Sequence, residues 1–405
     1  MPTRPHRFPD TPPDTPPRRL AARLAALRRD GRLRSRQALE GPQGARIRVD
    51  GREYLAFCSN DYLGLANHPR IVQAAVEAAL RYGVGAGASH LVTGHSVLHQ
   101  RLEARLAEFT GLPRALLFST GYQANIGAIT ALAGRGDAVF SDERNHASLI
   151  DGARLSRADV VRYAHCDLAS LDAAMAASGA AVKLVVSDSV FSMDGDIAPL
   201  PGLLALCQRH DALLLVDDAH GFGVLGAHGQ GALAHFGPEL RSPRIVYVGT
   251  LGKAAGVAGA FVAGADEVVE TVLQQARTYM FTTASPAMLA AAVDASLDIM
   301  REDDWRRERL RELIAALKRQ LKVTVTASGA RLAPSDTPIQ PLIIGGNAEA
   351  LAVSAALRER GILVTAIRPP TVAEGTARLR IALSAAHELA DVARLAMALN
   401  ETLSS

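Results

Sequence analysis

The sequence has little of what disulfide-rich, metal-caged or membrane-spanning proteins need. It contains an odd number of cysteines, none of them in CxxC spacing: Cys58, Cys166 and Cys207. This pattern favours reduced thiols in a cytosol and argues against a cysteine metal cage. The longest charge-free run, 115–134, holds polar side chains that a lipid-facing helix would tolerate poorly. Since no signal-peptide pattern opens the chain either, we expect a soluble cytoplasmic protein.

Net charge is also small, at +3, but it is unevenly distributed. Residues 1–36 carry ten arginines against three aspartates, a net +7, which leaves about −4 for the rest of the chain. Basic N-terminal segments can bind nucleic acid or membrane surfaces. Residues 1–17, however, are rich in proline and threonine, which predicts a disordered extension. Over 19–36, leucines at near-helical spacing predict an amphipathic helix that lies on the body of the protein.

Short apolar strands alternate with amphipathic helices from about residue 70 onward. Strands of four to six apolar residues between such helices are typical of a parallel-rich sheet that is covered on both faces. The expected helices are 70–82, 96–110, 122–132, 168–178 and 200–209, and the expected strands are 114–118, 137–140, 158–162, 182–187, 212–216 and 244–248. A strand pair around 46–57, with Asp50-Gly51 as its turn, precedes them.

The pattern changes after about residue 285. A long charged helix over 286–320 leads into four further strands and a smaller α+β domain, the strands being 321–326, 339–344, 361–366 and 378–383. With 405 residues, 48% hydrophobic and 21% charged, the chain can bury a large core. We therefore predict an α/β fold with three parts: a tail and helix (1–45), a large domain whose mostly parallel sheet has helices on both faces (46–285), and a C-terminal α+β domain (286–405).

Polar side chains gather where the predicted strands end, which is where open α/β sheets place their sites. Asp217 closes one apolar run, and Lys253 follows the next one. An acid and an amine at neighbouring strand ends suit pyridoxal phosphate, because the lysine can form a Schiff base with the aldehyde while the carboxylate keeps the pyridine nitrogen protonated. Taken singly, Asp217 could cap a turn and Lys253 could be a solvated loop lysine. Their combination with His220 and a phosphate-binding turn favours the cofactor.

The phosphate-binding turn is expected at 119–122, between a strand and a helix. Free N–H groups and the helix dipole attract anions there, and Gly121 allows close approach. Thr250, three residues before Lys253, could add a hydroxyl. His146 could stack on a pyridine ring or be a hydrogen-bonded loop histidine, and the sequence leaves both interpretations open.

Three other motifs carry less weight. Residues 221–226 match the motif GxGxxG, and residues 83–88 match its GxGxxA variant. Neither segment has the strand–turn–helix context of a Rossmann nucleotide site. His95 and His99 stand four residues apart on a predicted helix, with no Glu between them and no third ligand evident. We therefore expect no metal site.

With these motifs in view, the sequence resembles the α-oxoamine synthases, pyridoxal-phosphate enzymes of fold type I that condense an amino acid with an acyl thioester. The resemblance runs from about residue 20 to the C-terminus. The matching segments are Ser59–Gly64, Gly85–Gly94, Val190–Gly195, Asp217–Gly221, Thr250–Lys253, Ile367–Thr371 and Gly375–Arg380. Among them, Gly85–Gly94 and the last two segments favour the branch that makes 8-amino-7-oxononanoate for biotin biosynthesis.

The resemblance implies a role for each matching position. The implied catalytic residues are Lys253, His146, Asp217 and His220. The implied cofactor contacts are Gly121, Tyr122, His146, Ser192, Asp217, His220, Thr250, Lys253 and, from the partner subunit of a homodimer, Thr282. The implied substrate contacts are Arg34, Asn60, His146, Thr371 and Arg380, the last as a fork for the amino-acid carboxylate. Asp188 stands where the family usually has Glu, and we assign it no role.

These residues imply decarboxylative condensation of L-alanine with a pimeloyl thioester, carried by coenzyme A or an acyl carrier protein, in a homodimer with active sites at the subunit interface. We expect neither nucleic acid nor a membrane as a partner. Two alternatives stay open. A sister enzyme, such as 2-amino-3-ketobutyrate CoA ligase, would use glycine or serine. A non-catalytic protein would bind nucleic acid through the basic N-terminal segment, with strong salt dependence.

Overall fold

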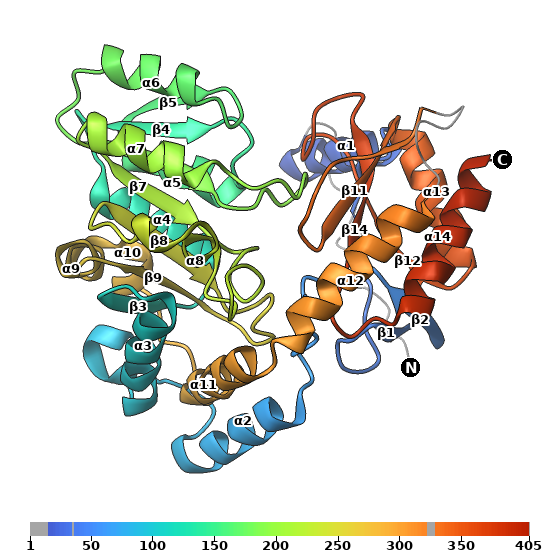
Figure 1. The fold of residues 1–405 in the computed structure, drawn as a ribbon, viewed down its shortest axis with the longest axis horizontal. Helices are drawn as coiled ribbons and strands as arrows, with labels where there is room; N and C mark the ends of the chain where they lie inside the picture. Colours follow the sequence, from blue (N-terminus) through green and yellow to red (C-terminus); the bar gives the residue numbers. More distant parts are fainter. Residues whose placement is uncertain (1–14, 35, 322–328, 405) are drawn as a thin grey trace.

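The chain folds into a large lobe and a small lobe, drawn on the left and right of Figure 1. This computed structural model describes residues 15–34, 36–321 and 329–404. The large lobe is built around a seven-stranded sheet, and the small lobe contains two smaller sheets. None of the helices formed by the described residues has both the length and the apolar character needed to cross a lipid bilayer.

The strands of the large sheet follow the order β3-β9-β8-β7-β6-β4-β5. They are β3 (Arg114–Phe118), β4 (Ala138–Asp142), β5 (Asp159–Tyr163), β6 (Lys183–Asp188), β7 (Leu213–Asp217), β8 (Ile245–Thr250) and β9 (Ala260–Gly264). Strands β4 to β8 are parallel, whereas β9 is antiparallel to both β3 and β8. The sequence analysis missed β9, because a short apolar run after a glycine-rich loop has no periodicity that separates a strand from a helix.

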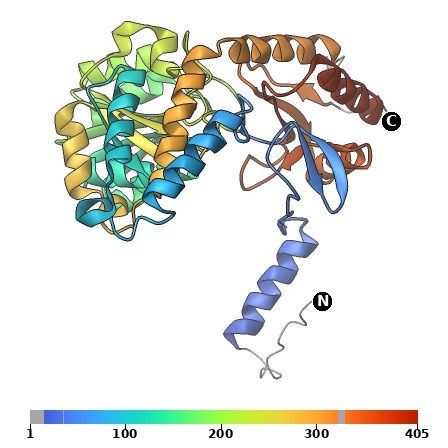
Figure 2. The same cartoon turned by 90° about the horizontal axis from the view of Figure 1, so that it is seen from below.

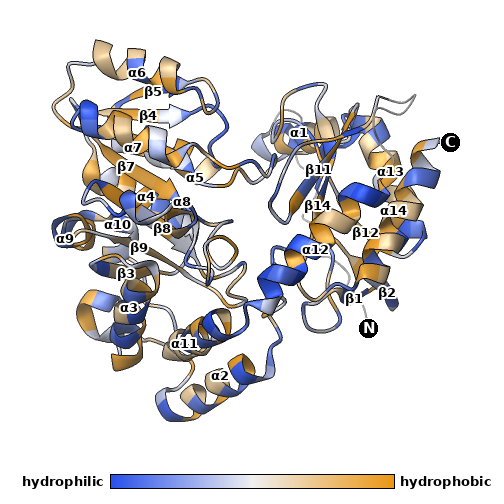
Figure 3. Ribbon diagram, viewed as in Figure 1, coloured by the Kyte–Doolittle hydropathy of each residue, from blue (hydrophilic) through white to orange (hydrophobic). Residues whose placement is uncertain are grey.

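Helices cover both faces of this sheet, as predicted. They are α2 (Pro69–Tyr82), α3 (Val97–Thr110), α4 (Gly121–Leu132), α5 (Ala147–Ser156), α6 (Leu168–Ala177), α7 (Leu200–Arg209), α8 (Ala232–Phe236), α9 (Asp266–Gln275), α10 (Arg277–Met280) and α11 (Ala287–Glu302). Successive residues of β7 enter different cores: Leu214 and Val216 join the core of α3, α7 and α11, and Leu215 joins that of α4, α5 and α9. This explains why β7 is hydrophobic along its length (Figure 3).

The small lobe combines the C-terminal part of the chain with an early hairpin. Its sheets are β10-β11-β14-β13 and β1-β2-β12. The strands are β1 (Arg46–Val49), β2 (Arg52–Ala56), β10 (Arg331–Leu332), β11 (Ile339–Gly345), β12 (Ile362–Leu363), β13 (Thr365–Ile367) and β14 (Ala377–Ala382). The predicted Asp50-Gly51 turn joins β1 to β2, with φ of 51° and 73°. Because β2 pairs with β12, this hairpin belongs to the small lobe and not, as its position in the sequence suggested, to the large one.

The predicted helix over 286–320 is two helices, α11 and α12 (Trp305–Gln320), separated by Asp303-Asp304. α11 packs against α2 and α3, whereas α12 packs against α14 (Leu389–Ser404). Each helix thus belongs to a different lobe, and Figure 2 shows the change of direction between them. α13 (Asn347–Glu359) completes the small lobe. The strand expected at 321–326 lies almost entirely outside the described residues.

The N-terminal helix differs from its prediction. α1 spans Pro16–Arg29 and contributes no buried residue. Leu20 and Leu24 are 55% and 53% exposed, and the helix points away from both lobes (Figure 2). The expectation that this helix lies on the body of the single chain is therefore wrong. The predicted disordered extension falls mainly on residues 1–14, which lie outside the described residues.

Candidate active site

The predicted acid and amine lie at the same edge of the large sheet. β6 ends with Asp188 and β7 ends with Asp217, and the strand register places these two residues side by side. β8 is the next strand along, and Lys253 follows it within one short turn. Parallel strands bring their carboxyl ends to one edge, so three short segments of sequence converge there.

Lys253 is a mostly buried amine with a histidine partner. Its Nζ lies 2.8 Å from Nε2 of His220. Burial lowers the pKa of Lys253 to about 8, although the carboxylates of Asp217 and Asp188 act in the opposite direction. His220 is fully buried, and burial together with the charge of Lys253 lowers its pKa well below the ordinary value. Lys253 can therefore hold and release a proton near neutral pH, with His220 as its hydrogen-bond partner.

Asp217 is held rigidly by hydrogen bonds. Its Oδ2 accepts from Asn125 Nδ2 at 2.6 Å, and its Oδ1 accepts from the main-chain N–H of Ala219 at 3.0 Å. The amide of Asn125 also donates to Ser148 Oγ, at 2.8 Å. The sequence analysis missed Asn125 and Ser148. An amide on the otherwise apolar buried face of helix α4 was the available signal.

His146 and Asp188 meet on the other side of Asp217. The main-chain N–H of His146 donates to Asp188 Oδ2 at 2.6 Å, and His146 Nδ1 lies 2.7 Å from Ser148 Oγ. Burial and the neighbouring charge of Asp217 raise the pKa of Asp188 well above its ordinary value. Partial burial lowers the pKa of His146. Asp188, to which no role was assigned, thus fixes the backbone of the residue expected to stack on the cofactor.

Tyr62 connects this edge of the sheet to the small lobe and was also missed. Its fully buried hydroxyl lies 2.6 Å from His220 Nδ1 and 3.1 Å from Asn60 Oδ1. Arg380 Nη2 donates to the same hydroxyl at 3.1 Å, while Nη1 donates to Asn60 Oδ1 at 3.0 Å. A chain of hydrogen bonds therefore runs from Lys253 through His220 and Tyr62 to Arg380.

Two arginines on β14 have different partners. Both side chains are buried, with Arg378 and Arg380 each 6% exposed. Arg378 Nη1 pairs with Asp194 Oδ1 at 2.6 Å. Arg380 binds neutral oxygens, including Ser192 O at 2.6 Å, and within the described residues no carboxylate lies at ion-pair distance from it. Because buried charges normally have a counter-charge, Arg380 is suited to bind a carboxylate supplied by a ligand.

The predicted phosphate-binding turn lies beside Thr250. A side chain at Gly121 would begin 3.7 Å from Thr250 Oγ1, so the turn and the hydroxyl face each other. Thr120 caps α4 by accepting from Gln123 N at 3.2 Å. The first N–H groups of a helix have no partner within the helix and favour an anion. The hydroxyl of Tyr122 bonds to Asp151, so only the main chain of Tyr122 is left for an anion in this turn.

The donor set fits pyridoxal phosphate. The sheet edge offers a buried amine for the aldehyde, a fixed carboxylate for the ring nitrogen and a helix N-terminus for the phosphate. The amide oxygen of Asn125 is buried without a hydrogen-bond partner among the described residues, so the site has polar capacity left for a ligand.

The remaining predicted residues lie further out. Ser192 lies in the turn after β6 and contacts Arg380 through its carbonyl oxygen, while Thr282 follows α10 and is half-buried. Arg34 and Thr371 are exposed. The segments that carry them are joined by an ion pair between Arg32 and Glu374 at 3.2 Å. The structure thus places Arg34 and Thr371 in neighbouring segments at the surface of the small lobe.

The histidine pair His95 and His99 has a third imidazole near it. His90 Nδ1 lies 2.9 Å from His95 Nδ1. His99, however, uses both ring nitrogens: Nδ1 accepts from Ser96 N at 3.0 Å, and Nε2 lies 2.8 Å from Ser285 O. A metal ion would have to displace one of these bonds, so this cluster is explained as a hydrogen-bonded core feature.

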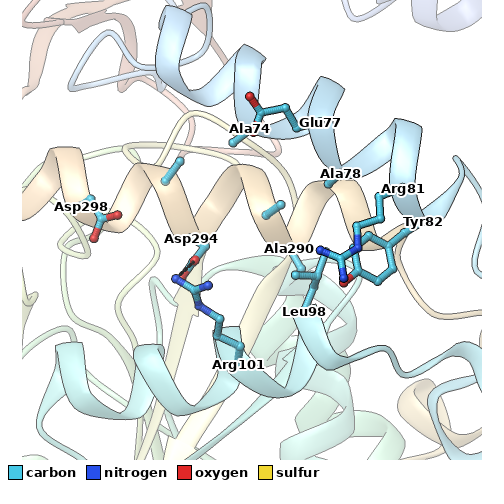
Figure 4. A pocket seen from close by; sticks show the side chains of 12 residues that line it. Ala74, Glu77, Ala78, Arg81, Tyr82, Leu98, Arg101, Ala290, Asp294 and Asp298 are labelled. Atoms are coloured by element: carbon cyan, nitrogen blue, oxygen red, sulfur yellow. Dashed lines mark ion pairs between the residues drawn. The ribbon is translucent and has the colours of Figure 1, made fainter.

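A groove of about 290 Å³ lies away from this site, between α2, α3 and α11 (Figure 4). Its charged side chains largely neutralise one another, as in the 2.9 Å pair of Arg101 and Asp294. It lacks the amine, the strand-end carboxylate and the helix N-terminus found at the sheet edge. The volume of this groove therefore does not identify it as the active site.

Comparisons with known proteins agree with the geometry. Residues 52–399 match the family model described as aminotransferase class I and II. The 8-amino-7-oxononanoate synthase of Nitrosospira multiformis is 62% identical over 368 residues, which cover 91% of each chain. Serine palmitoyltransferase from S. paucimobilis, solved with a bound PLP–myriocin aldimine, has a TM-score of 0.87 at 31% identity and covers 95% of this chain and 96% of its own. The 8-amino-7-oxononanoate synthase of Francisella tularensis has a TM-score of 0.72 at 30% identity, covering 87% and 97%.

These matches confirm the predicted fold of the type I pyridoxal-phosphate enzymes. They cover the whole sheet edge on which Lys253, Asp217 and His146 lie, and also the small lobe with Arg380. Fold, sheet edge and relatives together place the chain in the class I and II aminotransferase family, and within that family it belongs to the α-oxoamine synthases.

Proposed function

We propose that the protein is a pyridoxal-phosphate-dependent acyltransferase that condenses L-alanine with a pimeloyl thioester, with loss of carbon dioxide, to give 8-amino-7-oxononanoate for biotin biosynthesis. The observation that carries the proposal is the buried amine of Lys253 beside Asp217, on a chain whose relatives of that name match over nine-tenths of its length. When bound, pyridoxal phosphate would supply an aldehyde for Lys253 and a protonated ring that accepts electrons.

Lys253 is the proposed base for the alanine α-proton. Its pKa of about 8 leaves a useful fraction of neutral amine near neutral pH. His220, 2.8 Å from Nζ, orients the amine and is itself held by Tyr62. Asp217, fixed by Asn125, would keep the ring nitrogen protonated. Each of these groups is held in place before substrate arrives, which favours catalysis by position.

Arg380 is the proposed carboxylate fork. Its guanidinium is buried and bound to neutral oxygens, so the alanine carboxylate can supply the missing counter-charge. Asn60 lies against it, and Arg34 with Thr371 would contact the longer acyl substrate. The pimeloyl group would arrive as a thioester of coenzyme A or of an acyl carrier protein. The proposal includes a cytoplasmic homodimer in which Thr282 reaches the phosphate of the partner's site.

A substrate panel tests this function. The purified holoenzyme is offered alanine, glycine and serine, each with acetyl and pimeloyl thioesters. We expect turnover with alanine and the pimeloyl thioester to exceed every other pair, and the product mass to be that of 8-amino-7-oxononanoate. Preference for glycine with acetyl-CoA would show a sister activity instead.

A lysine comparison tests the assigned base. Lys253→Ala is expected to lower turnover by at least about 10³-fold. The matched control is Lys183→Ala at the opposite end of β6, which should retain activity. Near-normal rates in Lys253→Ala would refute the assignment.

A further inference from the structure

The turn from Phe191 to Asp196, here called the inter-lobe turn, lies between the two lobes. It follows β6 and closes on itself, since Phe191 N donates to Asp196 O at 3.0 Å and Gly195 N donates to Phe191 O at 2.8 Å. Val190 and Ile197 form an antiparallel bridge at its base. The turn is therefore a compact unit whose position depends on what holds it from each side.

The small lobe holds the inter-lobe turn through buried polar groups. Arg378 donates to Asp194, and Arg380 Nε donates to Ser192 O at 2.6 Å. The carbonyl of Gly195 accepts from the hydroxyls of Ser335 and Thr337, at 2.9 and 3.0 Å. Three of these four contacts are to main-chain carbonyls of the turn and the fourth is to the short side chain of Asp194. A shift of the turn would therefore move the carbonyl of Ser192 to which Arg380 donates.

The large lobe holds the same turn through His165. This residue follows β5, and its Nε2 lies 2.7 Å from Asp196 Oδ2 while its Nδ1 lies 3.0 Å from Asp142 Oδ1. Asp142 ends β4 and also accepts from the main-chain N–H of Arg144, two residues before His146. The ring packs edge-on against Phe191 at 4.4 Å. His165 thus bridges the end of β4 to the inter-lobe turn.

The two carboxylates require His165 to carry two protons. A neutral imidazole has one N–H donor, so only an imidazolium can donate to both acids. Burial alone would lower the pKa of His165, but its hydrogen bonds to Asp142 and Asp196 raise it to about 11. The Cys166 thiol, 3.7 to 3.8 Å from the ring nitrogens, is the third titratable group facing the ring. A metal ion held by Asp142, His165 and Cys166 would have to replace one of the two ring protons.

We propose that His165 is a positioning residue that holds the inter-lobe turn, and with it Arg380, in the orientation that binds the amino-acid carboxylate. His165 touches neither substrate nor cofactor in this scheme. It acts through Asp196, the turn and Ser192 O. The proposal rests on the carboxylate-binding role proposed above for Arg380.

The experiment compares His165→Gln with His210→Gln in the holoenzyme. His210 offers a matched control, because its Nε2 also pairs with a carboxylate, Asp172 Oδ1 at 2.6 Å, and its side chain is 14% exposed against 13% for His165. His210 follows α7, outside the inter-lobe turn. We expect His165→Gln to raise KM for alanine about tenfold, with a smaller change in kcat, an unchanged cofactor absorbance band and an unchanged KM for the thioester.

Two further readouts separate positioning from general destabilisation. Adding Asp196→Asn to His165→Gln removes the unpaired carboxylate. The double variant is therefore expected to have a KM for alanine between those of His165→Gln and the wild type. In ¹⁵N histidine spectra of the wild-type holoenzyme at pH 9, the resonances lost in His165→Gln should be those of a doubly protonated ring.

Three results would overturn the proposal. They are an unchanged KM for alanine in His165→Gln, an equal rise in His210→Gln, or a neutral His165 ring at pH 9. Arg380→Lys separates the carboxylate-binding role of Arg380 from the positioning role of His165. If Arg380→Lys raises KM for alanine and His165→Gln does not, only the positioning role fails. If Arg380→Lys leaves KM unchanged, the carboxylate role fails as well.

Discussion

The large lobe and the small lobe contribute to the candidate site in different ways. In the large lobe, Asp188 and Asp217 end two adjacent strands and Lys253 follows the next strand in a short turn, so hydrogen-bonded backbone largely fixes their spacing. In the small lobe, Arg380 reaches Asn60 and Tyr62 through side-chain hydrogen bonds between segments more than 300 residues apart. The first half is rigid before substrate binds, whereas the second depends on how the lobes meet. We therefore expect changes to Asp217 and Lys253 to act mainly on kcat, and changes to Arg380 and to the groups that position it mainly on KM for alanine.

After Lys253→Ala, the largest effect is expected for Asp217→Asn in the large-lobe half. Asparagine keeps the size of the side chain but removes the charge that stabilises a protonated ring nitrogen, so kcat should fall by about 10²-fold or more while KM for alanine changes little. Steady-state kinetics on cofactor-saturated protein make the measurement. A rise in KM with normal kcat would contradict the expectation that Asp217 acts mainly on kcat.

Arg380→Lys tests the small-lobe half and is expected to have the next largest effect. Lysine keeps the charge but cannot form the two parallel hydrogen bonds of a guanidinium, so KM for alanine should rise by about 10- to 100-fold. Arg378→Lys on the same strand is the comparison, because lysine can keep the ion pair with Asp194 that helps to hold the inter-lobe turn, so a smaller increase in KM is expected. Equal increases in both variants would mean that β14 acts only through its packing.

Tyr62→Phe tests how the two halves of the site are linked, because the tyrosine hydroxyl contacts a residue of the large-lobe half and a residue of the small-lobe half. Phenylalanine fills the buried volume but removes the bonds to His220 and Arg380. We expect kcat to fall and KM for alanine to rise, each by about tenfold or less. A change in only one constant would show that the hydroxyl serves one lobe alone.

The smallest effect concerns pH and His165. Because its pKa in the folded protein is raised to about 11 from an ordinary value of 6.5, its contribution to stability is complete below about pH 6.5 and is lost as pH rises toward 11. Chemical denaturation of wild type and His165→Gln should therefore show a stability difference that narrows between pH 7 and pH 10. A difference that grows with pH would contradict the imidazolium assignment.

The sequence predicted the large-lobe half better than the small-lobe half, for a physical reason. Strand periodicity and the rule that sites lie at the carboxyl ends of parallel strands were enough to bring Asp217 and Lys253 together. Tyr62 carries no local signal, and the buried amide of Asn125 does not reveal its partner, since both residues are important through a partner far away in the chain. The pairing of β2 with β12, which places the early hairpin in the small lobe, was hidden for the same reason.

Reduction of the bound cofactor followed by peptide mapping identifies the lysine that holds the cofactor. The chain has four lysines, Lys183, Lys253, Lys318 and Lys322. After borohydride treatment of the yellow holoenzyme, we predict that the mass of the reduced pyridoxyl phosphate group is found on the peptide that contains Lys253. A label on one of the other three lysines, or no label at all, would contradict the assignment of Lys253 as the cofactor lysine.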